Sequence, residues 1–591
     1  MRFQIFTFLL LALFLTACAS SGLAPQQNKT EKSQLKASAS PVNLEKMDIP
    51  FLYLAAQDAI NKRQYGLAIR FLQAIVKKEP EALEPRFELV ELILSSVHGK
   101  VQAQTYMETI PDAAVAAMSA TQYTQYQLLY ARSLIANQQS EQAAKLLKSI
   151  LQAQPQRVDV RLLLAKMYAI NHQYALAHDT VDTGLKAHQD LRLQRLKVQL
   201  LLQQGKLAQA DRLLKQMQAT YPEHEDIVLQ RAELAEKLGN SAKAERLLQQ
   251  FIQTRENTAL QSYHMLANIY ERQNKFNQAI AIYQKLIPLT ASDAEVLMSI
   301  GRLHYQMQAF DQAAGYFKQA VEQLTPQNKR APVRDDLATA SFYYGASLEA
   351  LHQWKQAIPE YQRLTPKHRF YLDAQMRLAS IDITYKQWDT AEKRLLELQA
   401  QYANNMAIYE LLSGLRLQQE RYRLLIQESD KALDLGFSRQ LLFNRAVAFE
   451  KLKAFEQLDK TLDSILAQNP NDAEALNFYG YSLAERGIRL DEAQRMLEAA
   501  LEIRPNDGYY LDSLAWIFFQ KGGYSKALTY QLKAVQYIPD DALMMEHLGD
   551  IYWQLGHQHQ AREAWEQSLK LGHEQAGRVE DKIENGLVSG E

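Results

Sequence analysis

Residues 542–573 contain the pattern that decides the fold, and their sequence is ALMMEHLGDIYWQLGHQHQAREAWEQSLKLGH. Leu548, Gly549 and Tyr552 are followed by a second small residue, Ala561, and by Trp565. Two helices that cross closely need Gly, Ala or Ser at the crossing, because a larger side chain keeps the backbones apart. The same spacing recurs through residues 470–571 at Gly480, Ala515 and Gly549, at Ala493, Ala527 and Ala561, and at Pro505 and Pro539, which are 34 residues apart.

The crossing position can be followed towards the N-terminus in steps of about 34 residues. It holds Ala446, Gly414, Ala379, Gly345, Gly301, Ala267, Ala232, Val198, Ala165, Ala131 and, in a first hairpin, Ala56. The apolar residues between these positions have helical periodicity, without long alternating stretches. The pattern predicts an all-α chain of roughly fourteen or fifteen helical hairpins. It resembles the tetratricopeptide-repeat family, which implies a superhelical solenoid.

The N-terminus has the features of an export signal. Residues 1–17 combine Arg2 with an apolar run that is too short to span a bilayer, which predicts a signal peptide. The sequence LTAC at residues 15–18 resembles a bacterial lipobox, and this resemblance implies lipidation of Cys18. An ordinary secretory signal with an incidental cysteine is the alternative. Residues 18–47 are rich in Ser, Ala, Gln and Lys, and they are expected to form a disordered tether.

The repeat array is expected to have two segments, residues 48–330 and 331–571, followed by a polar cap or tail at 572–591. The step from Gly301 to Gly345 is longer than the others, and the excess lies in the proline-containing and basic stretch 325–335. This stretch is either a surface loop or lengthened helix, or a hinge or basic contact point. The segment 111–119 is expected to be an insertion, since it interrupts the spacing.

The composition excludes several functional classes. The formal net charge is −1, so the chain lacks the basic field typical of nucleic-acid binding. A single cysteine excludes an internal disulfide and a cysteine-based metal site. No catalytic or phosphate-binding motif is present, and His557 and His559 fall in an expected turn. We therefore expect a protein that is not an enzyme and that uses neither a metal nor a cofactor.

The first helix of each hairpin is expected to line an inner groove, through residues three before, one after and four after the crossing. In the C-terminal repeats these positions give an aromatic and acidic lining. The candidate protein-binding residues are Asn477, Tyr481, Asp512, Trp516, Phe519, Asp550 and Trp553. The alternative for the large aromatic residues is packing against the adjacent repeat. The Lys/Asn pairs by which some tetratricopeptide domains bind a terminal carboxylate do not occur in register.

The combination of lipobox, tether and repeats resembles a group of outer-membrane lipoproteins in Gram-negative bacteria. Its length and repeat coverage are most similar to the lipoprotein adaptor of the periplasmic carboxy-terminal processing protease. That resemblance implies a lipid-anchored adaptor on the periplasmic face of the outer membrane. Its partners would be a Ser/Lys processing protease and peptidoglycan hydrolases. A scaffold of a polysaccharide-export or envelope-assembly complex is the alternative.

Cys18→Ala tests the lipidation hypothesis. The substitution removes the only thiol that could carry the lipid, so the protein is expected to leave the membrane fraction without unfolding. The measurement is immunoblotting of washed membranes and soluble fractions, with circular dichroism as the control for folding. Persistence of the variant in washed membranes would contradict the lipobox interpretation.

Overall fold

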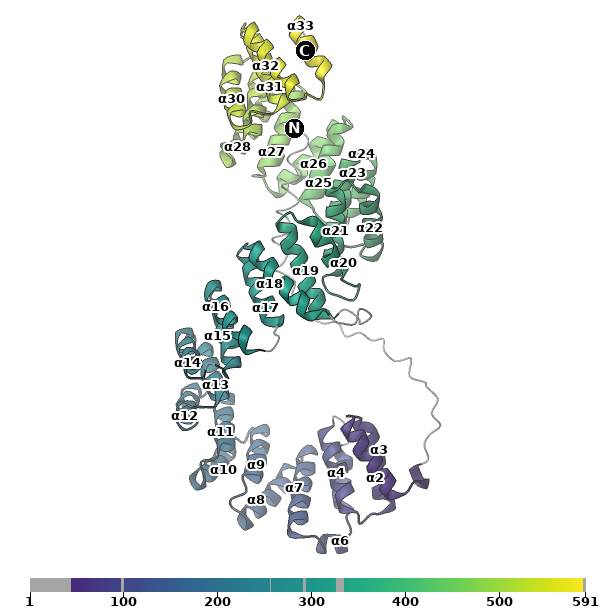
Figure 1. Ribbon diagram of the computed structural model, residues 1–591, viewed down its shortest axis with the longest axis vertical. Helices are drawn as coiled ribbons and strands as arrows, with labels where there is room; N and C mark the ends of the chain where they lie inside the picture. The colour runs from purple at the N-terminus through teal and green to yellow at the C-terminus, as the bar shows by residue number, and fades with distance from the viewer. Residues whose placement is uncertain (1–43, 97–99, 256, 291–293, 326–333, 588–591) are drawn as a thin grey trace. The chain divides into compact units, whose positions relative to one another are not determined.

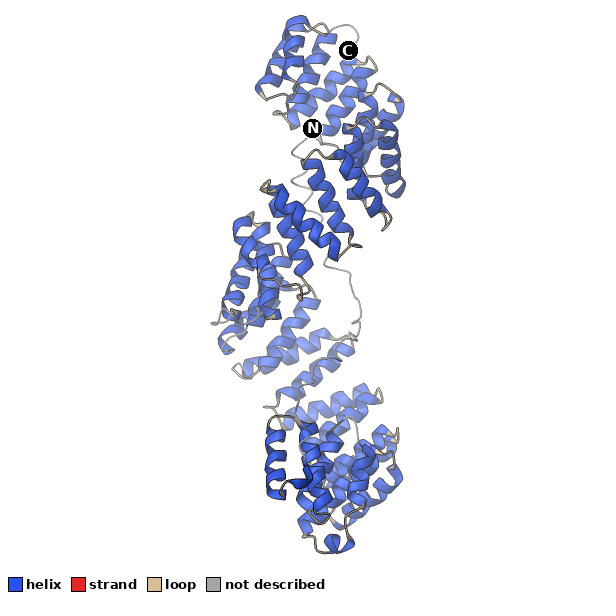
Figure 2. Cartoon of the chain, turned by 90° about the vertical axis from the view of Figure 1, so that its right-hand side faces the viewer, coloured by secondary structure: helices blue, strands red, loops and turns tan. Residues whose placement is uncertain are grey.

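The computed structural model describes residues 44–96, 100–255, 257–290, 294–325 and 334–587. Within these ranges the chain consists of helices and their connecting turns, and no strand occurs (Figure 2). The predicted all-α class is therefore confirmed. The predicted signal peptide, Cys18, tether residues 18–43 and residues 326–333 of the basic stretch lie outside the described residues.

The described residues divide into two compact units, one that ends at Leu303 and one that begins at His304. This division falls inside one helix, α17 (Ala294–Gln306). The expected repeat segments, residues 48–330 and 331–571, stay a prediction. In each unit, consecutive helices pair as antiparallel hairpins, and each hairpin packs on the next (Figure 1).

The first unit begins with a short turn that packs on the first hairpin. Leu44 and Met47 contact its apolar core, so the expected tether ends before residue 44. Between α5 and α7 the additional short helix α6 occupies the predicted insertion. The elements are η1 (Leu44–Lys46), α2 (Ile49–Asn61), α3 (Tyr65–Lys78), α4 (Leu83–Ser95), α5 (Lys100–Glu108), α6 (Asp112–Ala116), α7 (Ala120–Ala136), α8 (Ser140–Ala153), α9 (Val158–Ile170), α10 (Tyr174–Ala187), α11 (Leu191–Gln203), α12 (Leu207–Thr220), α13 (Glu225–Lys237), α14 (Ser241–Thr254), α15 (Leu260–Arg272), α16 (Phe276–Leu286), η2 (Ile287–Leu289) and α17 (Ala294–Gln306).

The second unit continues the same pattern and ends in a single helix, α33, which has no partner helix after it among the described residues. Its helices are α18 (Phe310–Leu324), α19 (Asp335–Ala350), α20 (Trp354–Gln362), α21 (Tyr371–Thr384), α22 (Trp388–Gln401), α23 (Met406–Gln418), α24 (Tyr422–Leu433), α25 (Arg439–Lys451), α26 (Phe455–Gln468), α27 (Ala473–Glu485), α28 (Leu490–Ile503), α29 (Gly508–Gln520), α30 (Tyr524–Tyr537), α31 (Ala542–Gln554), α32 (Gln558–Lys570) and α33 (Ala576–Asn585).

The residues predicted at the crossings are buried, except for Gly414, which is half-buried. The alanines of the second helices are 0% exposed at positions Ala68, Ala143, Ala177, Ala210, Ala244, Ala279, Ala313, Ala357, Ala391, Ala493, Ala527 and Ala561. A Cβ added to Gly480 would lie 2.9 Å from the side chain of Leu497, and one added to Gly549 would collide with the indole of Trp565. At Gly480 and Gly549 the two helices of a hairpin therefore approach so closely that a larger side chain would displace its neighbour.

Helix starts in the C-terminal repeats are fixed by aspartate. The side chains of Asp472, Asp507 and Asp541 accept hydrogen bonds from backbone N–H groups in the first turns of α27, α29 and α31. Each such cap contributes about 1 kcal/mol to helix stability. The recurrence of Asp shortly after Pro505 and Pro539 thus sets where each repeat begins.

Gly549→Ala and Gly414→Ala form a matched pair at the crossing position. The first adds a methyl group against buried Trp565, so we expect a loss of about 1–3 kcal/mol in the free energy of unfolding. The second adds a methyl group where no atom lies within 4 Å. Because alanine favours a helix more than glycine does, we expect Gly414→Ala to raise the free energy of unfolding by about 0.5–1 kcal/mol. Thermal unfolding followed by circular dichroism measures both. Equal effects of the two substitutions would refute close packing as the reason for Gly549.

Candidate protein-binding surface

The seven candidate residues lie on the first helices α27, α29 and α31, at the spacing of one helix face. Asn477 and Tyr481 are four residues apart on α27, as are Asp512 and Trp516 on α29, and residues at this spacing share a face. Helices α27 and α29 contact each other directly, as do α29 and α31. The structure therefore places the candidates on adjoining surfaces of three successive repeats.

Three aromatic rings form a stack between α29 and α31. The ring of Trp516 lies 4.7 Å from that of Phe519 and 4.2 Å from that of His547, with interplanar angles of 7° and 18°. Trp516 and Phe519 are partly exposed, whereas His547 is buried. Trp516 therefore packs on His547 of the adjacent repeat, as the alternative interpretation of this residue predicted, and part of its surface is still accessible.

Asp512 is buried and hydrogen-bonded inside the unit. Its Oδ1 accepts from Gln531 Nε2 at 2.7 Å and lies 2.9 Å from His547 Nδ1. Burial lowers the pKa of His547, but the charge and hydrogen bond of Asp512 outweigh burial and raise this pKa above its ordinary value. The Asp512 carboxylate consequently joins α29 to α30 and α31.

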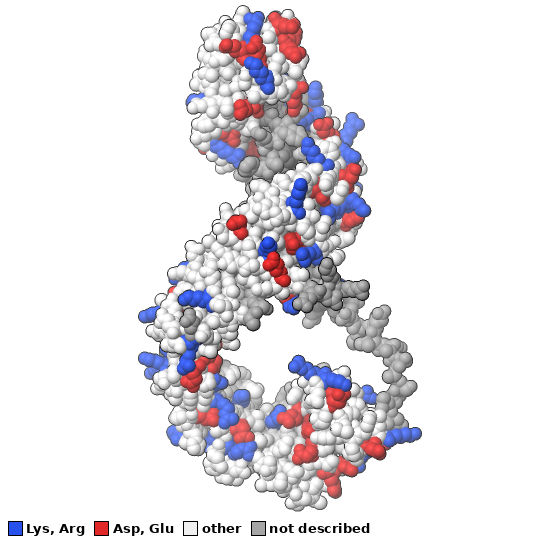
Figure 3. All heavy atoms as spheres, in the orientation of Figure 1, with Lys and Arg blue, Asp and Glu red and all other residues white. Residues whose placement is uncertain are grey.

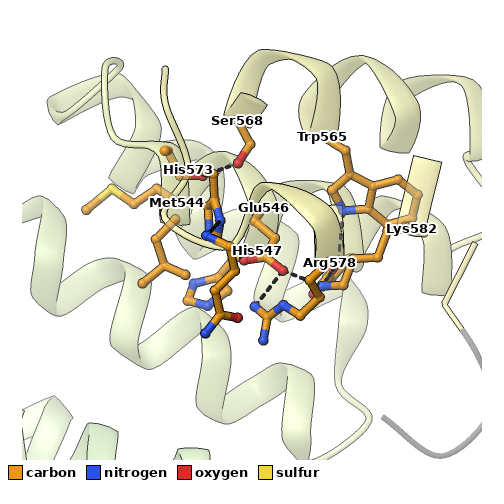
Figure 4. Close-up of polar contacts among 12 residues, drawn as sticks. Met544, Glu546, His547, Trp565, Ser568, His573, Arg578 and Lys582 are labelled. Atoms are coloured by element: carbon orange, nitrogen blue, oxygen red, sulfur yellow. Dashed lines mark hydrogen bonds and ion pairs between the residues drawn. The ribbon is translucent and has the colours of Figure 1, made fainter. Parts of the chain in front are cut away.

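The acidic side chains of α31 are paired with cations from α33 (Figure 4). Lys582 Nζ lies 2.6 Å from Glu546 Oε1 and 2.7 Å from Asp550 Oδ2, and Arg578 donates to Glu546 Oε1 at 2.6 Å. Asp550 also accepts a hydrogen bond from the indole N–H of Trp565 at 2.9 Å. Lys582 is only 6% exposed, so this arrangement is a buried ion-pair network that docks the last helix.

The two carboxyl groups of this network differ in their pKa shifts. Burial raises the pKa of Glu546, but the charges of Lys582 and Arg578 overcome it, so the pKa is lower than usual. At Asp550 burial dominates over Lys582, and the pKa is raised. Since a depressed pKa stabilises the folded state only while the group is ionised, the contribution of Glu546 is lost as the pH falls below about 4.5.

Trp553 is partly exposed, and the side chains and backbone near the C-terminal helices pack on its ring. Its ring lies 5.6 Å from that of Trp565 and 5.5 Å from the guanidinium carbon of Arg562. A Cβ on Gly586 would collide with the Trp553 indole, so the glycine backbone packs directly on this ring. The positive φ of 77° at Gly586 is a second reason for glycine at this position.

The structure thus separates the seven candidates by accessibility. Tyr481, Trp516, Phe519 and Trp553 are partly exposed, whereas Asn477, Asp512 and Asp550 are buried. Their role in partner binding stays a prediction. Sequence reasoning missed Arg578 and Lys582 as partners of the α31 acids. Their spacing of four residues, beside the apolar face of Val579 and Ile583, was the available signal.

A hollow lies in the first unit, on the first helices of three successive hairpins, α9, α11 and α13. It has a volume of about 520 Å³. Arg195, Gln199 and Leu202, which occupy the predicted groove positions of α11, are among its lining residues. Its lining also includes Lys166, Arg192 and Glu233, and Arg195 is paired with Asp226 at 2.6 Å.

No other chemistry is evident in the described ranges. They contain no cluster of three or more His, Cys, Asp or Glu side chains that could hold a metal ion. Among these residues, no helix combines the length and the apolar character needed to cross a bilayer. Acidic and basic side chains are interspersed on the face shown in Figure 3, in agreement with the balanced net charge.

Comparison with protein families identifies the repeated hairpin. Models described as tetratricopeptide repeat match residues 134–200, 201–262, 264–329 and 543–571. The chain contains tetratricopeptide repeats. The matches fall in both compact units, and paired helices also occur outside the matched residues.

Two curated proteins are similar to parts of the tetratricopeptide array. TPR repeat-containing protein PA4667 of Pseudomonas aeruginosa is 29% identical over 215 residues, which cover 36% of this chain and 36% of that protein. Protein O-mannosyl-transferase TMTC1 of Homo sapiens is 23% identical over 259 residues, which cover 43% of this chain and 24% of that protein. The chain therefore spans about a third and about a quarter of their lengths.

Solved structures with similar helical arrays include the APC/C hetero-tetramer Cut9-Hcn1 and yeast Tom70. The match to the first is 13% identical and covers 92% of this chain and 97% of that chain, with a TM-score of 0.34. The match to the second is 16% identical and covers 71% and 94%, with a TM-score of 0.32.

Lys582→Met tests the buried network at the end of the tetratricopeptide array. Removing the cation leaves Glu546 and Asp550 buried with reduced compensation, so we expect a loss of about 3–5 kcal/mol in the stability of the last helices. Hydrogen exchange of α31 to α33 measures this loss. Lys570→Met, an exposed lysine on α32, is the matched control and should change little. Similar exchange in both variants would exclude the network as the force that docks α33.

Proposed function

We propose that this protein is a non-catalytic, lipid-anchored adaptor that binds periplasmic proteins through its repeat groove. In this proposal it brings a carboxy-terminal processing protease to peptidoglycan hydrolases at the periplasmic face of the outer membrane. Tetratricopeptide repeats support the binding of protein partners in general. The lipobox resemblance at Cys18 supports the anchor, and the resemblance to protease adaptors supports the choice of partners.

The partly exposed stack of Trp516 and Phe519 is the observation that carries the binding role. Rigid aromatic side chains lose little conformational freedom on binding, and they often dominate the energy of protein interfaces. Tyr481, also partly exposed, extends this surface onto α27. A partner that covers the stack would bury apolar area without ordering a flexible loop.

An adaptor of this kind needs no catalytic group of its own. Holding a protease and its substrate on one chain converts their encounter into an intramolecular event, at an effective concentration of about a millimolar. Anchoring at the membrane would confine that reaction to the neighbourhood of the cell wall. The tetratricopeptide array would thus act on the rate of proteolysis through proximity alone.

A pull-down with residues 19–591 from periplasmic extract tests the proposal. We expect retention of a processing protease together with peptidoglycan hydrolases, identified by mass spectrometry. Trp516→Ala should weaken retention by about 2 kcal/mol or more, since it removes a central aromatic anchor. Leu532→Ala, which truncates a side chain 46% exposed on α30, is the matched control and should retain the partners. Retention of export or assembly components without a protease would overturn the protease partnership.

A further inference from the structure

The first hairpin of the array, α2 and α3, leaves an apolar strip uncovered. Phe51 is 56% exposed and Leu54 is 69% exposed. Both lie on α2 at a spacing of three residues, so they share one face of the helix. Asp58 and Lys62 continue this face, and their side chains form an ion pair at 2.7 Å. We call Phe51, Leu54 and the Asp58–Lys62 pair the end face of α2.

Equivalent positions in later repeats are covered by the preceding hairpin. Phe51 lies five residues before the crossing residue Ala56, and Leu54 lies two residues before it. Met544, at the Phe51 position of α31, shares an apolar cluster with Ala534 of the preceding helix α30. The buried residues at these two positions of later repeats include Val160, Leu193, Leu196, Ile227, Tyr510 and Met544. No hairpin precedes α2 among the described residues, so its end face lacks this cover.

The short element η1 packs beside the first hairpin without hiding this strip. Glu45 of η1 pairs with Lys77 of α3 at 2.8 Å, and Lys78 donates to the carbonyl oxygen of Met47 at 2.6 Å. These contacts bring the chain onto α3 immediately before the first turn of α2, which carries Phe51. The terminal face of a repeat array is usually polar, because it has only solvent beside it. An aromatic and an aliphatic side chain at this place therefore indicate a surface that something else covers.

Positive charge is concentrated in and before the first hairpin. Residues 44–78 contain six Lys and Arg against three Asp and Glu, and residues 18–43 contain three Lys against one Glu. Residues 18–78 therefore carry a formal net charge of +5, whereas residues 79–591 carry −7. A chain with almost no net charge thus has a basic N-terminal part, which attracts anionic surfaces.

Several of these cations are available to an external anion. Lys46 precedes α2 and Arg63 follows it, so exposed cations flank the apolar strip at both ends. Neither forms an ion pair with another described residue, and the same holds for exposed Arg70 on α3. The neighbouring acids Glu45 and Asp58 are already paired with lysines. The end face consequently combines apolar side chains with uncompensated positive charge.

A phospholipid surface matches this combination. Phe and Leu side chains enter the boundary between headgroups and acyl chains, while flanking Lys and Arg side chains are attracted to anionic headgroups. The proposed lipidation site, Cys18, lies only 26 residues before Leu44. A flexible linker of this length typically spans about 30 Å, so α2 would lie within reach of the bilayer. A second copy docked face to face on the same strip would instead bring like charges together.

We propose that the end face of α2 docks on an anionic phospholipid surface, with Phe51 and Leu54 inserted at the headgroup level and Lys46 and Arg63 beside lipid phosphates. This inference rests on the proposed lipid anchor, and it adds a second contact by which the first hairpin is held at the membrane. Two side chains give only weak and reversible binding without the lipid. Washing therefore removes a Cys18→Ala chain, and the lipidation test keeps its meaning.

Vesicle binding by residues 19–591 tests this inference. The fragment keeps every described residue and contains no cysteine, so Leu54→Cys and Leu532→Cys each offer one site for an environment-sensitive fluorophore. The vesicles contain either phosphatidylglycerol with phosphatidylethanolamine, or phosphatidylcholine alone. On the anionic vesicles, the fluorophore at position 54 should shift to shorter wavelength, and the fluorophore at position 532 on α30 should not. The neutral vesicles should bind the fragment more weakly, because they do not attract its cations.

Phe51→Ser combined with Leu54→Ser should lower the partition coefficient onto anionic vesicles about tenfold, because it removes the apolar side chains that enter the bilayer. Leu532→Ser combined with Tyr537→Ser is the matched control. It removes an aliphatic and an aromatic side chain that are 46% and 50% exposed on α30, and it should leave the partition unchanged. Circular dichroism checks that both double variants are folded, and sedimentation with the vesicles measures the partition.

Three results would overturn the inference: no spectral shift at position 54 on anionic vesicles, equal binding to both kinds of vesicle, or equal effects of the two double substitutions. Self-association that is lost in the Phe51 and Leu54 double variant, without vesicle binding, would assign the end face to a second copy instead. The proposed function has separate readouts. If vesicle binding fails while Cys18→Ala leaves the washed membranes and the pull-down retains protease and hydrolases, the anchored adaptor stands and the docking face fails.

Discussion

Close contact between two helices at a small residue is the interaction on which the structure depends. The alanines of the second helices are fully buried, and at Gly480 and Gly549 even one added methyl group meets a neighbouring side chain. One hairpin formed in this way leaves an apolar face uncovered, since it has only two helices. Each hairpin therefore needs the next, and stability accumulates along the array from contacts between neighbours.

The last described hairpin, α31 and α32, has no following hairpin to cover its apolar face, and the single helix α33 packs there instead. A helix of mostly polar residues places Val579 in the apolar core and sends Arg578 and Lys582 to the acids of α31. This pairing offsets the cost of burying the two carboxylates, because the same acids would strongly destabilise the fold if they were buried without cations. The last helix thus covers the terminal repeat by apolar and ionic contacts together.

The fold was predictable because its determinants are local and periodic. The spacing of small residues located the hairpins, from the first one at Ala56 to the one at Gly549 and Ala561. The candidate surface was predictable only as a set of helix faces. Whether Asp550 faces a partner or the interior depends on Lys582, which is 32 residues further along the chain. Periodicity within one helix contains no information about a cation supplied by another element.

The contrast between α27 and α31 shows that equivalent helices of successive repeats differ in how their polar side chains are paired. Both helices place acids on the same kind of face, and both are held by the same contacts with their second helices. On α31 the acids are compensated from within and contribute to stability. On α27, the buried Asn477 Oδ1 accepts no hydrogen bond among the described residues, and an unsatisfied buried acceptor costs the folded state about 1–3 kcal/mol. Within a periodic fold, the polar contacts of a given helix face therefore depend on which side chains the neighbouring elements supply.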